Sequence, residues 1–182
     1  MKTSHLCIAV WACLLCANTA LAQLNGLTSG KRYSFTETKV MPKLNKTTER
    51  KGSMVFNAPD QLAMDYSQPD GDYTHITATS FDVKKNGKVQ HFPVDNPKQR
   101  MTIFRSTLLY CLGGEVDKAA ELNHATKTMT DGAKLRVCTI SVDKADPKEI
   151  AAIRLEYDAK NGQLIALTIT EGNGNYTVYS IR

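Results

Sequence analysis

Apolar and polar residues alternate with a period of two along most of this sequence, a pattern typical of strands with one buried face. Leu62, Met64 and Tyr66, for example, alternate with small or polar neighbours. Further predicted strands are 53–57, 81–84, 89–92, 135–142, 153–157, 165–169 and 176–181. The sequence therefore predicts a mainly β fold, in which strands far outnumber helices.

Turn residues between these segments indicate that consecutive strands are antiparallel. Asn86-Gly87 and Asn161-Gly162 each separate two predicted strands. Asn-Gly is a strong hairpin signal because both central residues of such a turn adopt a positive φ. We therefore expect a meander of hairpins and no β-α-β units.

One helix is predicted over residues 97–112. Asn96 suits the N-cap and Pro97 the first helical position, and Gly113-Gly114 is expected to end the helix. Met101, Phe104, Leu108 and Leu112 recur at steps of three or four and form one apolar stripe, and Arg105 lies off it. A second, weaker helix is predicted over 115–123.

The first 22 residues are typical of a signal peptide. A lysine precedes a short apolar stretch, and Ala20-Leu21-Ala22 matches the small-x-small cleavage pattern. Residues 23–182 are then expected to form a single domain, since no linker, repeat or low-complexity segment divides them. The formal net charge of +5 is mild and its lysines and arginines are scattered, which argues against nucleic-acid binding.

Catalytic and cofactor motifs are missing from the sequence, so no enzyme, no metal and no cofactor is expected. His75, His91 and His124 do not have metal-ligand spacing. Asp70 and Asp72 are predicted to lie in a solvated turn.

Cys111 and Cys138 are the two cysteines that remain beyond the signal peptide. Two interpretations stay open: a disulfide, which an oxidising compartment allows, or two buried thiols that act as small hydrophobic side chains.

A sheet this large cannot be covered by one good helix of about 24 Å. Either the sheet packs on itself as a sandwich or closed barrel, or it keeps a hollow that is lined for an apolar ligand.

The segment Gly52–Pro69, GSMVFNAPDQLAMDYSQP, resembles the two consecutive strands that characterise the LolA family of periplasmic lipoprotein carriers. Phe35-Thr36-Glu37 resembles the F-T-Q strand of that family, and Asn86-Gly87-Lys88 resembles its D-G-K turn. Residues 164–181 resemble its closing hairpin, so the similarity covers most of 33–181 in the family's order.

This resemblance implies an incomplete antiparallel β-barrel with a helical lid and an apolar cavity. It also implies a periplasmic monomer that shields the acyl chains of lipoproteins or lipids between membranes. An ABC-type transporter of the inner membrane would load such a carrier, and an outer-membrane receptor would unload it. Two alternatives are a relative with different cargo or a lipoprotein-sensing role, and a packed β-sandwich that acts as an envelope interaction module without an internal ligand.

Apolar residues at family positions and on neighbouring strand faces are the candidates for lining the cavity. They are Met54, Phe56, Leu62, Met64, Tyr66, Phe104, Leu108, Leu112, Leu155 and Leu167. Two departures from the family predict a smaller or more open lid. Ala58 stands where the family often has an arginine that closes the lid, and residues 23–34 are poor helix material.

Overall fold

The computed structural model describes residues 24–96 and 99–182. The predicted signal peptide, residues 1–22, and Pro97 lie outside the described residues. The elements are β1 (Arg32–Met41), a 3₁₀ turn η1 (Pro42–Leu44), β2 (Lys46–Asn57), β3 (Gln61–Gln68), β4 (Asp70–Ile76), β5 (Ser80–Lys85), β6 (Lys88–Pro93), α1 (Arg100–Gly113), α2 (Val116–Leu122), β7 (Thr126–Asp131), β8 (Leu135–Ser141), β9 (Ile150–Asp158), β10 (Leu164–Glu171) and β11 (Tyr176–Ile181).

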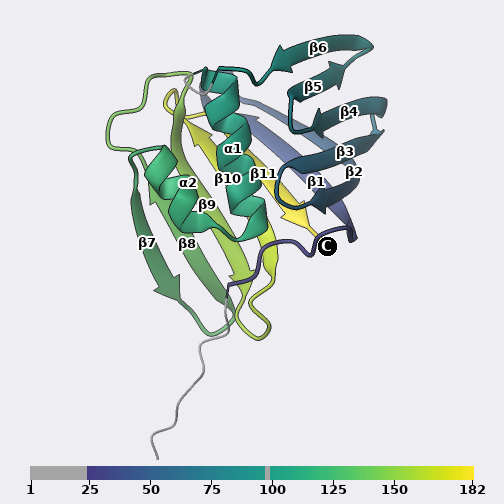
Figure 1. Cartoon of the computed structure of the whole chain (residues 1–182). Coiled ribbons are helices and arrows are strands. Elements are labelled where there is room, and N and C mark those ends of the chain that lie inside the picture. The colour runs from purple at the N-terminus through teal and green to yellow at the C-terminus, as the bar shows by residue number, and fades with distance from the viewer. Residues whose placement is uncertain (1–23, 97–98) are drawn as a thin grey trace, which may run out of the picture.

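The strands form one continuous antiparallel sheet in the order β6-β5-β4-β3-β2-β1-β11-β10-β9-β8-β7. Within the described residues β6 and β7 do not pair with each other, so the barrel stays open between these two edges. Both helices lie over the same face of the sheet (Figure 1). The predicted incomplete antiparallel β-barrel with a helical lid is thereby confirmed.

The inner, helix-facing side of the sheet carries the core. Residues of β3 alternate between buried and exposed, with Leu62, Met64 and Tyr66 buried as the period-two pattern predicts. Tyr33 of β1, Met54 of β2 and Leu155 of β9 are also almost fully buried. Burial of such side chains contributes about 1.5–3 kcal/mol each.

Only one of the two Asn-Gly hairpins has the expected backbone. Asn86 and Gly87 have φ values of 52° and 76°, which confirms the tight turn between β5 and β6. Between β9 and β10 only Gly162 has a positive φ, of 69°. There the Asp158 carboxylate accepts hydrogen bonds from the backbone N–H groups of Lys160 and Asn161, and this side-chain cap favours a longer loop.

Helix α1 begins later than the sequence predicted, at Arg100. The N–H of Gln99 donates to the carbonyl of Asn96 at 3.0 Å, so a turn precedes the helix and Asn96 is not its N-cap. The predicted stop is confirmed, because Gly114 adopts φ 80° and its N–H donates to the carbonyl of Cys111. The weaker second helix is also confirmed, as α2.

The segment before β1 fastens the end of α1 to the sheet, and residues 24–34 contain no helix, as predicted. The N–H of Leu27 donates to the carbonyl of Leu112 at 2.7 Å. A Cβ on Gly26 would lie 2.3–2.5 Å from the backbone of residues 112–114, so only glycine allows this close approach. In the described part of the chain no helix is long and apolar enough to cross a membrane.

Candidate functional site

A cavity of about 500 Å³ lies between the helices and the inner face of the sheet. Its roof comes from α1 and from residues 122–124 at the end of α2. Its floor comes from β1–β5, β10 and β11, and its side from residues 148–150 before and at the start of β9. The lid therefore does not fill the space that the curved sheet encloses.

One part of the cavity wall is apolar. Phe104 and Leu108 face it from α1, and Met64 and Tyr66 face it from β3. The Phe104 ring stacks on Phe81 of β5 with 6.0 Å between ring centroids and an interplanar angle of 5°. These side chains form a surface that suits an apolar ligand.

The structure distributes the predicted lining residues over three environments. Met64, Tyr66, Phe104 and Leu108 line the cavity itself. Met54, Leu112 and Leu167 pack around a crevice of about 10 Å³ beside it, where the C-terminal half of α1 approaches the sheet. Phe56, Leu62 and Leu155 are buried and line neither space.

The other part of the cavity wall is charged, and sequence reasoning did not name Glu37 or Arg50 as lining residues. Glu37 of β1 is directly opposite Arg50 of β2, with 3.6 Å between Glu37 Oε1 and Arg50 Nη1. Tyr66 Oη donates to Glu37 Oε2 at 2.5 Å. The Arg50 Cζ atom lies 3.5 Å from the centroid of the Tyr66 ring, a cation–π contact.

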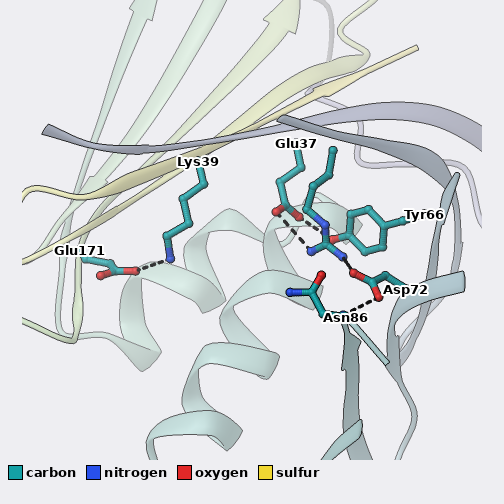
Figure 2. Close-up of polar contacts among 7 residues, drawn as sticks. Glu37, Lys39, Tyr66, Asp72, Asn86 and Glu171 are labelled. Atoms are coloured by element: carbon teal, nitrogen blue, oxygen red, sulfur yellow. Dashed lines mark hydrogen bonds and ion pairs between the residues drawn. The ribbon is translucent and has the colours of Figure 1, made fainter. Parts of the chain in front are cut away.

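Asp72 completes this group, which we term the Arg50 network (Glu37, Arg50, Tyr66 and Asp72). Arg50 Nη2 donates to Asp72 Oδ2 at 3.0 Å, and Asp72 Oδ1 accepts from the backbone N–H of Asn86 at 2.8 Å. Figure 2 shows Glu37, Tyr66, Asp72 and Asn86 converging at one place. The predicted solvated turn is wrong for Asp72, which lies on β4 and is only 4% exposed.

The network could have been suspected from strand periodicity. Glu37 follows Tyr33 and Phe35 at steps of two, so the alternation places a carboxylate on the apolar face of β1. Asp72 precedes the buried Ile76 by four residues, which is two steps of the same period. A charge on a buried face requires a partner, but the partner itself is given only by the strand register.

Burial changes the ionisation of the tyrosines beside the network. Burial, then the negative charge of Glu37 and the hydrogen bond to it, raise the pKa of Tyr66. Burial and the same carboxylate raise the pKa of Tyr179, which faces the cavity from β11. Both phenols are therefore neutral at physiological pH and serve as hydrogen-bonding and ring surfaces.

Charged side chains outside the Arg50 network also line the cavity. Lys39 Nζ lies 3.6 Å from Glu171 Oε1, and the two residues project from β1 and β10 (Figure 2). Lys85, Arg100 and Lys148 line the cavity from β5, α1 and the loop before β9. In the described parts of the chain, none of these three has a carboxylate within 4.0 Å.

Cys111 and Cys138 are free, fully buried thiols in this structure. Burial, followed by the nearby Cys138, raises the pKa of Cys111 to about 12. The arrangement corresponds to the second of the two interpretations of the pair, small buried side chains. Among residues 24–96 and 99–182, no group of three or more histidine, cysteine or carboxylate side chains could hold a metal ion.

Solved structures with a similar fold include proteins of the superfamily that the sequence resembles. A LolA superfamily protein from Nitrosomonas europaea is 5% identical, with 88% of this chain and 87% of that chain covered and a TM-score of 0.42. Lipoprotein LppX from Mycobacterium tuberculosis is 13% identical, with 83% of each chain covered and a TM-score of 0.41. A DUF1329 family protein from Desulfovibrio piger is 10% identical, with 85% of each chain covered and a TM-score of 0.40.

The sequence itself matches no protein-family model and no curated protein. At identities of 5–13% the similarity concerns the course of the chain alone and carries no conclusion about ligand or activity. Any functional argument therefore has to come from the cavity.

Proposed function

We propose that this protein is a periplasmic, non-enzymatic carrier that shields the acyl chains of lipids or acylated lipoproteins in its cavity. The observation that carries the proposal is the space of about 500 Å³ between the lid and the sheet. That volume falls within the range of about 300–1,000 Å³ that is usual for small-molecule sites.

An acyl chain is the ligand that this space suits best. Removing about a dozen methylenes from water stabilises the bound state by roughly 10 kcal/mol, at about 0.8 kcal/mol each. Phe104, Leu108 and Met64 offer an apolar surface for such a chain, and the thioether of Met64 can adapt to chains of different shape. An acylated molecule could then cross an aqueous compartment without exposing its chains.

The partners follow from the resemblance rather than from the cavity. We propose an inner-membrane ABC-type transporter as the donor of cargo and an outer-membrane receptor as the acceptor. The proposal also includes export through the predicted signal peptide, with cleavage after Ala22, and a monomeric carrier.

Titration with the uncharged dye N-phenyl-1-naphthylamine tests the proposed site. Ile103 of α1 is half-buried and lines the cavity, so an Ile103→Trp side chain would occupy the ligand's space. We expect saturable binding of one dye per protein, and a Kd increase of at least about tenfold in I103W, which corresponds to about 1.4 kcal/mol.

Val89→Trp is the matched control, because Val89 is 58% exposed on β6 and does not line the cavity. V89W should bind the dye as the unsubstituted protein does. Absence of saturable binding by the unsubstituted protein, or equal Kd values for I103W and V89W, would argue that the cavity is not a ligand site.

A further inference from the structure

The inner face of the sheet changes from apolar to charged along β1 and β10, and the charged end, with Lys39 and Glu171, is termed the mouth of the cavity. On β1 the inner face runs from Tyr33 and Phe35 to Glu37 and Lys39. On β10 it runs from Leu167 through Ile169 to Glu171. Since Lys39 is opposite Thr177, and Thr177 is opposite Ile169, the polar ends of the two strands lie on the same side of the sheet.

Segments far apart in the sequence contribute cations to the cavity lining. Five cationic and three carboxylate side chains line the cavity. Glu37 pairs with Arg50 and Glu171 with Lys39, whereas Glu149 accepts only the backbone N–H of Asp146 and keeps its negative charge, so the lining has two more cations than carboxylates. Lys85, Arg100 and Lys148 are exposed, have no carboxylate within 4.0 Å in the described part of the chain, and come from β5, α1 and the loop before β9.

We propose that the cargo is an anionic amphiphile, whose acyl chain occupies the apolar part of the cavity while its carboxylate or phosphate head is held at the mouth by Lys85, Arg100 and Lys148. This inference rests on the proposed carrier function and names its substrate class. An excess of cations over carboxylates beside an apolar cavity favours a ligand with one negative group next to its chain. A neutral lipid would leave these charges without a partner.

Paired fluorescent probes with the same chain test the head-group site. Cis-parinaric acid carries a carboxylate, and its methyl ester is uncharged. At pH 8 and low ionic strength we expect the acid to bind the exported protein about tenfold more tightly than the ester. Added salt should reduce this preference, since screening weakens partly exposed charge pairs.

Removing the three cations should abolish the preference without removing the cavity. In the variant K85Q/R100Q/K148Q, the acid should bind as weakly as the ester, and binding of the ester should stay unchanged. The control variant K43Q/K88Q/K160Q loses the same charge from exposed positions that do not line the cavity, and it should keep the preference.

Displacement of bound parinaric acid distinguishes the two sources of such a head group. Laurate would identify a fatty-acid carrier and lysophosphatidylglycerol an anionic phospholipid carrier, whereas zwitterionic lysophosphatidylcholine should compete at least about tenfold less well. Equal affinity for acid and ester would overturn the head-group assignment and leave the carrier function intact. Failure of both probes to bind would overturn both.

Discussion

Replacing Arg50 with methionine is expected to lower the free energy of unfolding by about 3–5 kcal/mol. Arg50 is 11% exposed and is the cationic partner of both Glu37 and Asp72. Without it, two carboxylates stay buried with no opposing charge, and that cost exceeds the value of the lost contacts. Urea denaturation followed by circular dichroism measures the difference.

Two further variants separate the charge effect from a simple packing defect. Arg154→Met removes an exposed ion pair with Glu156 on the outer side of β9 and should cost less than about 1 kcal/mol. The triple variant E37Q/R50M/D72N leaves no net charge in the network and should recover a large part of the loss. Equal stability of R50M and R154M would show that Arg50 does not stabilise the fold by compensating two buried carboxylates.

Truncating Arg105 to alanine is expected to cost about 2–4 kcal/mol and to loosen the lid. Arg105 lies on α1 and is only 9% exposed. Its Nε and Nη2 atoms donate to the carbonyl of Thr77 at 3.1 and 2.5 Å, and Nη2 also donates to the carbonyl of Asp60 at 3.2 Å. Hydrogen bonds to a charged group each contribute about 1.5–3 kcal/mol.

The geometry of Arg105 explains why the effect should reach the lid. Thr77 lies in the turn between β4 and β5, and Asp60 lies in the turn between β2 and β3. The guanidinium therefore joins α1 to two turns of the sheet. Hydrogen exchange should show faster exchange of α1 amides in R105A, together with a lower urea midpoint.

Two further substitutions, Arg105→Lys and Arg100→Ala, serve as controls for this prediction. Arg105→Lys keeps the charge but not the planar fork of donors, so it should be intermediate. Arg100→Ala removes an exposed arginine from the same helix and should change stability by less than about 0.5 kcal/mol. Unchanged exchange in R105A would show that the lid is held by other contacts.

Most of the sheet could be predicted because strand alternation and turn signals are local, but β4 and β7 were not among the predicted strands. Alternation in Leu62, Met64 and Tyr66, and the Asn86-Gly87 turn, each depend on a few adjacent residues. The same reasoning failed at the start of α1, where the turn closed by Gln99 and Asn96 overrides the expected N-cap. It also failed at Asn161, where the Asp158 side chain reshapes the loop.

The candidate site was predictable only in its apolar part. Phe104 and Leu108 follow from helical periodicity, and the structure places both on the cavity. Arg105 lies off that stripe, as the spacing indicates, yet it is buried because its partners are backbone carbonyls, which no residue type reveals. Glu37 and Arg50 meet only because β1 and β2 pair in one register.

Strand alternation identifies buried residues but does not separate those that line the cavity from those in the core. Leu62 and Met64 lie on the same face of β3, yet only Met64 lines the cavity. The position of α1 decides this difference, since its C-terminal half packs close to the sheet and its N-terminal half leaves space. Helix placement depends on long-range contacts, such as the hydrogen bond from Leu27 to Leu112.

Native mass spectrometry of the exported protein, purified from the periplasm without detergent, tests most directly whether the cavity holds an acyl chain. We expect a second species, heavier than the polypeptide by the mass of one lipid, whose dissociation releases an anion that contains an acyl chain. I103W should lack this species, and V89W should retain it. A spectrum with the bare polypeptide alone, unchanged after incubation with phosphatidylglycerol vesicles, would contradict the proposed carrier function.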